Sequence, residues 1–275
     1  MSARSLDGPI PNTPIVSTPI VSTPIVSTPV SNTPVRHEAR SFARHGLLCN
    51  VLLAAAVLWA GLAHGMPPEK VELSFEISFG AMKLGVGEDR LEHDGKNYQV
   101  NNDTIPKGLA AIFIDDIRRE SKGAITSAGL QPVSFIEKGR KDGIRAAEFD
   151  WSNKKLRLIH GESNKVIELP QHTIDQASLP YAFAFAGKVP ENFSLHVTDG
   201  RRLKEYRYRI VGEETIKTVL GEYKAIHIEK VRGPDDKRSF EFWVAVEHNY
   251  LPVQVRFTDK KGRQFDSVVT AIRYP

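Results

Sequence analysis

From residue 71 onward, apolar and polar residues alternate with a period of two, and this alternation constrains the fold more than any other feature of the sequence. In residues 71–79 every second residue is apolar, and the residues between them are Glu or Ser. Residues 240–247 and 251–257 also place apolar residues at every second position. Because successive side chains of a strand point to opposite faces of a sheet, each segment predicts a strand with one buried face.

Short turn sequences separate these segments and indicate how the strands connect. Asp94-Gly95, Asp142-Gly143 and Lys261-Gly262 are examples that lie between alternating runs. Connections this short join antiparallel neighbours, whereas parallel strands need crossovers of a dozen or more residues. A sheet of about ten or more strands must curl or split. We therefore predict a mainly β domain with a single antiparallel, strongly curved sheet or partial barrel.

Two segments depart from the alternation and predict short helices. Apolar residues recur at helical spacing over residues 105–117, and a second apolar segment covers residues 179–186, with Asp175 as its N-cap. Both helices are too short to be stable alone, so we expect them to pack over the concave face of the sheet. There they would cover a ligand, and the candidate ligand-binding residues are Leu109, Ile112, Phe113, Tyr181, Phe183 and Phe185.

The first 65 residues predict a disordered head followed by an export segment. Residues 1–34 carry a Thr-Pro-Ile-Val-Ser repeat, in which a proline in every copy prevents helix formation. In residues 35–65, three arginines precede the sixteen uncharged residues 47–62, and small residues follow, which is the order of a secretory signal. A membrane span usually takes about 20 apolar residues, so the length favours a cleaved signal. An inner-membrane anchor over residues 47–62 stays open as the alternative, and residues 66–275 would form the exported, periplasmic domain.

Cysteine usage and charge narrow the range of functions. The only cysteine, Cys49, lies inside the export segment, so the exported domain has neither a disulfide nor a thiolate nucleophile. The net charge of +4 is small and is spread over segments of alternating sign, unlike the basic patch that binds nucleic acid. We therefore expect no nucleic-acid partner and no cofactor, and we expect membrane contact only through the N-terminal segment.

Motifs with catalytic chemistry are few. The sequence has no P-loop and no His-Glu-x-x-His motif, and Gly161-Glu162-Ser163 lacks the second glycine of a nucleophile elbow. The sharpest polar pair is His172 and Asp175, which could act as a general acid and base. The structural alternative, which we favour, is that Asp175 caps the following helix. We therefore assign no catalytic residue and no metal ligand.

Turn and strand residues of the exported domain resemble a known family. They are Gly80 to Gly85, residues 126–132 and 175–179, Gly212-Glu213-Glu214 with Gly221, and Trp243 leading to Leu251-Pro252-Val253. This set resembles the bacterial envelope family known as domain of unknown function 3108 over nearly the whole of residues 70–275. The resemblance implies a Gram-negative, mostly periplasmic location and an antiparallel sheet similar to the curved half-barrels of lipoprotein carriers. It supplies no catalytic residues.

Three functions are compatible with these observations. The leading hypothesis is a non-enzymatic periplasmic or envelope protein that binds a lipid or other apolar or amphipathic ligand, or an envelope protein, in the concave face of its sheet. The second is an envelope-acting hydrolase or transferase that uses His172 and Asp175. The third is a structural or assembly factor without a ligand.

Overall fold

The computed structural model of the chain describes residues 65–113, 115–139, 143–234 and 236–275. The predicted repeat head and export segment, up to residue 64, lie outside the described residues. Their boundaries, and the choice between a cleaved signal and an anchor, therefore stay predictions. Among the described residues, no helix has the length and hydrophobicity that a membrane crossing requires.

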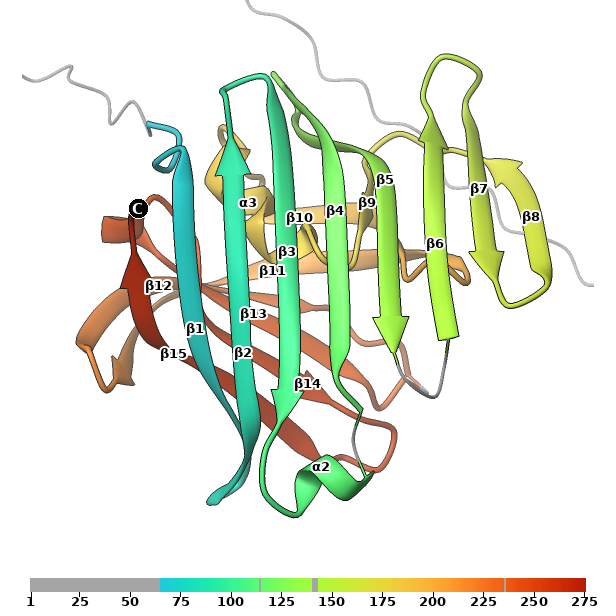
Figure 1. Cartoon of the computed structure of the whole chain (residues 1–275). Coiled ribbons are helices and arrows are strands. Elements are labelled where there is room, and N and C mark those ends of the chain that lie inside the picture. Colours follow the sequence, from blue (N-terminus) through green and yellow to red (C-terminus); the bar gives the residue numbers. More distant parts are fainter. Residues whose placement is uncertain (1–64, 114, 140–142, 235) are drawn as a thin grey trace, which may run out of the picture. The chain divides into compact units, whose positions relative to one another are not determined.

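The described residues contain fifteen strands, and all of them belong to one sheet (Figure 1). The strands are β1 (Lys70–Phe79), β2 (Met82–His93), β3 (Asn97–Pro106), β4 (Ile117–Thr126), β5 (Gly129–Gly139), β6 (Gly143–Asp150), β7 (Lys155–His160), β8 (Ser163–Glu168), β9 (Thr173–Asp175), β10 (Asn192–Thr198), β11 (Leu203–Thr218), β12 (Gly221–Lys230), β13 (Ser239–Ala245), β14 (Leu251–Thr258) and β15 (Gln264–Arg273). The helical elements are α2 (Ala110–Phe113), η1 (Leu179–Tyr181), α3 (Ala182–Phe185) and η2 (Val246–His248).

The order of strands across the sheet follows the chain in two runs. It goes from β8 to β1 and then from β15 to β9, so the pairing of β1 with β15 joins the first strand to the last. Figure 1 shows the sheet curving so that β1–β6 stand in front of β11–β15. The prediction of a mainly β, single, curved sheet is confirmed.

One pairing departs from the predicted antiparallel sheet. β9 and β10 run parallel, and His196, Val197 and Thr198 pair with residues 173–175. Residues 176–191 connect the two strands, and this segment is long enough for the crossover that a parallel pair requires. It contains η1 and α3, the second of the two predicted helices.

The core lies between the two halves of the curved sheet. On β1, Leu73 and its neighbours at positions 71 and 75 are buried, as the alternation predicts. Tyr181 of η1 packs in the same apolar cluster as Leu73 and Leu251, while Phe183 of α3 packs in a cluster that includes Phe242. The segment between β9 and β10 therefore supplies aromatic side chains to both halves of the core.

The predicted helices are shorter than the sequence pattern indicates. Ile105 belongs to β3 and pairs with Val86 of β2. The hydrogen bonds between these strands prevail over the local helical spacing, so the first helix is reduced to the four residues of α2. Asp175 does not bond the N-terminus of η1 itself. Its Oδ1 accepts hydrogen bonds from the backbone N–H groups of Ala177 and Ser178, both at 2.9 Å, and so holds the turn that leads into η1.

Candidate ligand-binding site

A cavity of about 510 Å³ opens inside the curved sheet, between β1–β4 and β13–β15. Its wall is mostly apolar and takes side chains from strands far apart in the sequence, among them Phe75, Ile77, Ile117, Phe240, Val255 and Phe265. Pro180 of η1 also lines the cavity, so the segment between β9 and β10 forms part of the wall. Small-molecule sites typically have volumes of about 300–1,000 Å³ and apolar walls with a few polar groups.

Gly87 of β2 contributes empty space to this cavity. A Cβ at this position would lie 3.4 Å from Phe75 Cβ and 3.8 Å from Ile77 Cδ1, which is ordinary van der Waals contact. The backbone of Gly87 has no positive φ that would demand glycine. A larger side chain could therefore be accommodated by the strand, and it would occupy the volume that a ligand needs.

Five polar side chains form a row across β2–β6 at the inner end of the cavity. Each of them pairs directly with the next on the neighbouring strand, so they share one face of the sheet; in order they are Asp89, Asn102, Arg119, Glu137 and Arg145. The first three line the cavity. Arg119 donates to Glu137 Oε2 at 2.6 Å and Arg145 donates to Glu137 Oε1 at 2.9 Å. The Glu137 side chain is only 8% exposed, so two arginines share one buried carboxylate.

Asp89 is the acidic group of the cavity wall. The Tyr181 hydroxyl donates a 2.6 Å hydrogen bond to Asp89 Oδ2. Burial raises the pKa of Asp89 to about 6, although hydrogen bonds from Tyr181 and Asn102 and the charge of Arg119 act in the opposite direction. A carboxyl group with such a raised pKa in a cavity is a candidate for function, because its desolvation opposes folding.

Replacing Asp89 by Asn is expected to stabilise the domain at pH 8 by about 1–2 kcal/mol. The raised folded-state pKa means that the folded carboxyl takes up its proton before the unfolded one as pH falls. The unfolding free energy of the wild type should therefore rise as pH falls from above 6 towards 4, and its difference from the variant should shrink. Urea denaturation of both proteins between pH 4 and 8 measures this. A variant that is less stable than the wild type throughout would show that the carboxylate is satisfied by its partners.

His172 and Asp175, the pair that the alternative enzymatic hypothesis requires, are not brought together. Asp175 is fully buried, and its Oδ2 accepts a 2.5 Å hydrogen bond from Ser121 Oγ, which in turn lies 3.1 Å from the Tyr98 hydroxyl. Burial raises the pKa of Asp175 to about 6. The His172 side chain is exposed, and within the described part of the chain no contact joins it to Asp175. Asp175 is thus part of a buried hydrogen-bond network with Ser121 and Tyr98. Its neighbour Gln176 lines the cavity.

Residues 74–268 match the family model described as "Protein of unknown function (DUF3108)". The chain belongs to this family. The match covers most of the sheet, from β1 into β15, and so includes the strands that form the cavity.

The DUF3108 domain shares its fold with a solved structure from Brucella abortus. That structure is a beta-barrel-like protein of domain of unknown function DUF1849, with 8% sequence identity and a TM-score of 0.51, and the similarity covers 75% of this chain and 97% of that one. Two other solved structures are similar at 10% identity. One is the MucA/MucB complex of Pseudomonas aeruginosa, with a TM-score of 0.30; the similarity covers 74% of this chain and 51% of that one. The other is a putative outer membrane lipoprotein-sorting protein domain from Vibrio parahaemolyticus, with a TM-score of 0.23; the similarity covers 74% of this chain and 84% of that one. No curated protein has a matching sequence.

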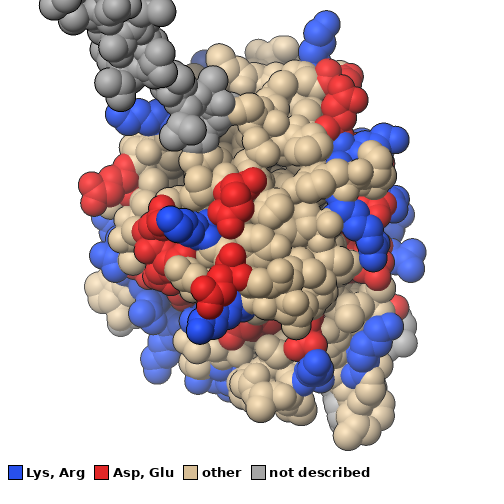
Figure 2. All heavy atoms as spheres, turned by 90° about the vertical axis from the view of Figure 1, so that its left-hand side faces the viewer, with Lys and Arg blue, Asp and Glu red and all other residues tan. Residues whose placement is uncertain are grey.

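A second, basic pocket of about 290 Å³ adjoins the cavity of the DUF3108 domain. The two share the lining residues Gln176, Phe240 and Phe257. One acid, Asp199, lines the basic pocket together with five basic residues, which are Arg145, Arg202, Lys204, Lys230 and Arg238. On the surface shown in Figure 2, by contrast, acidic and basic side chains are interspersed. The polar row ends at this pocket, because Arg145 belongs to both.

Three of the predicted ligand-binding residues lie in the core of the DUF3108 domain. Tyr181, Phe183 and Phe185 are 0%, 6% and 8% exposed, and none of them is a lining residue of the cavity or of the basic pocket. Instead, the cavity is lined by Pro180 and the basic pocket by Leu179, both from η1. The buried aromatic residues therefore lie behind the segment that forms the wall, and a part for them in binding stays a prediction.

The other predicted residues lie at one end of the sheet. Leu109 is 81% exposed and Ile112 is 63% exposed, in the connection between β3 and β4, while the side chain of Phe113 is outside the described residues. Phe79 and Met82, at the adjoining ends of β1 and β2, are also exposed apolar side chains. Figure 1 shows α2 beside this end of the sheet. The structure thus places Leu109 and Ile112 apart from Tyr181, Phe183 and Phe185, near the end of the cavity that Pro106 and Ile117 line.

Proposed function

We propose that this protein binds an amphipathic ligand with an anionic head group, as a non-enzymatic component of the bacterial envelope. The apolar part of the ligand would occupy the cavity, and the head group would occupy the basic pocket. The observation that carries the proposal is the junction of the two spaces through shared lining residues. A periplasmic location is part of the proposal and rests on the predicted export segment.

The apolar part of the ligand is matched by the cavity wall. Phenylalanine and aliphatic side chains line the space from both halves of the sheet, and burial of each methylene group there would contribute about 0.8 kcal/mol. The polar groups of the wall are few and mostly satisfied: Asp89 accepts from Tyr181, and Arg119 donates to Glu137. The wall therefore favours an apolar chain over a polar one.

An anionic head group is matched by the charges of the second pocket. Arg202 and Lys230 are paired with Asp199 and Asp236, at 3.4 Å and 2.5 Å, whereas Lys204 makes no ion pair with another described residue. Asp236 also lies 3.6 Å from Arg238, and Glu137 binds Arg145, so three carboxylates face the five cations and an excess of positive charge remains. Guanidinium and ammonium groups form charge-assisted hydrogen bonds with carboxylate or phosphate oxygens, so the pocket favours a ligand that carries one of these groups.

A group of exposed apolar residues lies near one end of the cavity and is the proposed entry. The group consists of Phe79, Met82, Leu109 and Ile112. They lie near the end of β3 and the beginnings of β2 and β4, where Leu84, Pro106 and Ile117 line the cavity. Single exposed apolar side chains are ordinary, but a group of them beside an apolar cavity is typical of a ligand entrance. The expected role of Leu109 and Ile112 is therefore contact with the ligand during uptake and release.

The proposal is tested with a fluorescent polyene fatty acid and its uncharged methyl ester. We expect the acid to bind at least about tenfold more tightly than the ester, because a hydrogen bond to a charged group contributes about 1.5 kcal/mol or more, and about 1.4 kcal/mol is a factor of ten in affinity. Changing both Lys204 and Arg238 to Gln should remove this preference and leave binding of the ester unchanged. Fluorescence titration of both probes against both proteins gives the four affinities.

A cavity-filling variant provides the control for the apolar part. Gly87→Leu should weaken the binding of acid and ester alike, because the new side chain occupies the cavity. If the wild type binds neither probe, the proposed function is wrong. Equal binding of both probes would retain the apolar cavity but reject the anionic head group.

A further inference from the structure

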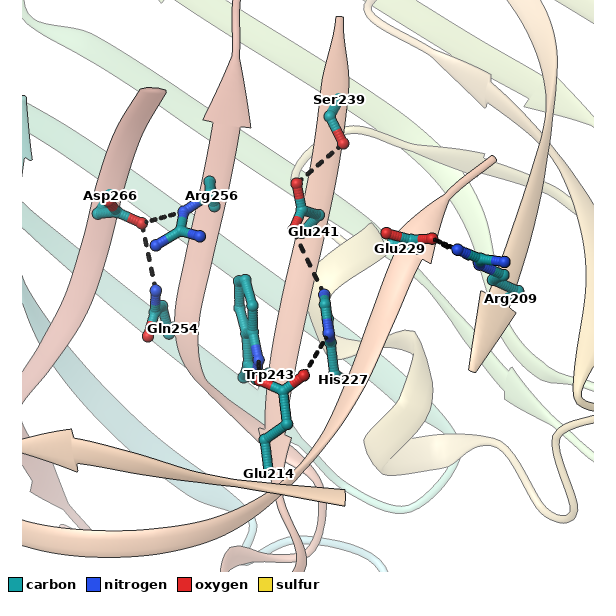
Figure 3. A network of polar contacts seen from close by, with 10 residues as sticks. All are labelled: Arg209, Glu214, His227, Glu229, Ser239, Glu241, Trp243, Gln254, Arg256 and Asp266. Atoms are coloured by element: carbon teal, nitrogen blue, oxygen red, sulfur yellow. Dashed lines mark hydrogen bonds and ion pairs between the residues drawn. The ribbon is translucent and has the colours of Figure 1, made fainter. Parts of the chain in front are cut away.

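A polar network on the opposite face of the sheet meets the proposed ligand site only at Ser239, which lines the basic pocket and bonds Glu241. His227 of β12 and Trp243 of β13 are direct ladder partners, and their rings stack with centroids 4.2 Å apart (Figure 3). His227 Nδ1 lies 2.8 Å from Glu214 Oε1, and the Trp243 indole N–H donates to Glu214 Oε2 at 2.8 Å. Phe242 and Phe240 point to the other face, where Phe240 lines the cavity.

The second nitrogen of the His227 ring is the unusual group of this network. His227 is 8% exposed, and its Nε2 is inaccessible to solvent and makes no hydrogen bond of ordinary geometry with another described residue, although a protonated ring would form an ion pair with Glu241. Its nearest polar neighbour is Glu241 Oε2 at 3.4 Å, while Ser239 donates to the other oxygen of that carboxylate at 3.0 Å. In a neutral ring this buried nitrogen would have no donor to pair with, which is costly unless a proton or a metal ion lies between it and the carboxylate. With Nδ1 donating to Glu214, a neutral ring directs the lone pair of Nε2 towards Glu241.

We propose that His227, Glu229 and Glu241 bind a divalent first-row transition-metal ion such as Zn²⁺. One donor atom from each of the three side chains lies within 4.8 Å of the other two. Imidazole nitrogen and carboxylate oxygen bind zinc at about 2.0–2.2 Å, so two such ligands of a tetrahedral ion stand roughly 3.3–3.5 Å apart. The 3.4 Å between Nε2 and Glu241 Oε2 fits this separation.

The surroundings of the three side chains match those of a metal site. Glu214 bonds the distal nitrogen of His227, as second-shell carboxylates do in proteins when they fix the tautomer of a metal-binding histidine. Arg209 holds Glu229 through a 2.5 Å hydrogen bond. Glu214, Glu229 and Glu241 outnumber the one arginine bound to them, so the charge balance favours a cation. Figure 3 shows Glu214 and Glu241 on either side of the His227 ring.

The test is a calorimetric titration of the full-length chain, freed of metal by a chelator, with Zn²⁺ at pH 7.5. We expect one ion to bind per chain, and we expect binding to be lost in His227→Asn and in Glu241→Gln. Asn in place of His227 retains an N–H near the position of Nδ1 but removes Nε2. Glu214→Gln should weaken Zn²⁺ binding about 10- to 100-fold, because it removes the group that orients the ring.

The control for surface binding is His172→Asn, which removes an exposed histidine. Residue 172 has a φ of 54°, a conformation that asparagine tolerates, so this variant should fold and should bind Zn²⁺ as the wild type does. Circular dichroism establishes which variants fold, and Glu241→Gln decides the question if His227→Asn does not. Absence of Zn²⁺ binding by the folded wild type, or binding unchanged in Glu241→Gln, would overturn the proposal and leave His227 as an imidazolium between two carboxylates.

Discussion

Replacing Phe183 by Ala is expected to lower the free energy of unfolding by about 3–5 kcal/mol. Its side chain is 6% exposed and packs against Phe193 and Phe242, with both ring centroids 5.9 Å away. Removing the ring would leave a void between α3 and the strands β10 and β13. Urea denaturation of wild type and variant at one pH measures the difference.

The matched control for this change is Phe79→Ala. Phe79 is 37% exposed at the end of β1, so its loss should cost about 1 kcal/mol or less. The fatty-acid titration, performed on the same samples, separates a core role from a ligand-binding role. If Phe183→Ala abolished probe binding with little loss of stability, the Phe183 side chain would face the ligand, as the sequence pattern predicts, and its burial in the core would be wrong.

Replacing Glu137 by Gln is expected to cost about 3–5 kcal/mol, because it removes a buried carboxylate that bonds two partly buried arginines. Arg119 and Arg145 approach it at 2.6 Å and 2.9 Å, and each arginine side chain is 19% exposed. Without the negative charge, the two guanidinium groups would repel each other across neighbouring strands while still partly desolvated. Thermal and urea denaturation both report this loss.

An exposed ion pair on the same part of the sheet provides the comparison. Glu148 lies 3.1 Å from Arg157, but its side chain is 62% exposed, so Glu148→Gln should change stability by no more than about 1 kcal/mol. Raising the salt concentration should reduce the small effect of Glu148→Gln more than the large effect of Glu137→Gln. Equal effects of the two substitutions would show that the Glu137 bridge is solvated and that the polar row is not a buried element of the structure.

Strands such as β1, β13 and β14 could be predicted because their signal is local. In β1 the alternation of apolar residues with Glu and Ser matches the buried and exposed positions, and the short turns correctly indicate antiparallel neighbours. The helix over residues 105–117 was predicted too long for the opposite reason. Ile105 has helical spacing to Leu109, but its backbone pairs with Val86, and no local pattern contains that pairing.

The polar row could not be predicted because its members look like surface residues in the sequence. Arg118 and Arg119 are adjacent, yet the first side chain is 76% exposed and the second 19% exposed. β4 has no clear alternation that assigns either one to a face. One position did indicate the row in the sequence. Asp89 lies two residues before the buried Leu91 on β2, so its side chain points to the same face of the sheet.

By itself, the sequence determined the class of the fold and the resemblance to the family, since strand alternation, turn residues and the Trp243 to Val253 motif are all short-range features. Only the tertiary structure decided where the candidate sites lie. The pairing of β1 with β15 joins residues almost 200 positions apart, and curvature of the sheet then brings Phe75 and Phe240 to one cavity. The same pairings set His227 beside Glu241 on the other face. Such contacts depend on the register between distant strands, and a period of two along one strand does not specify that register.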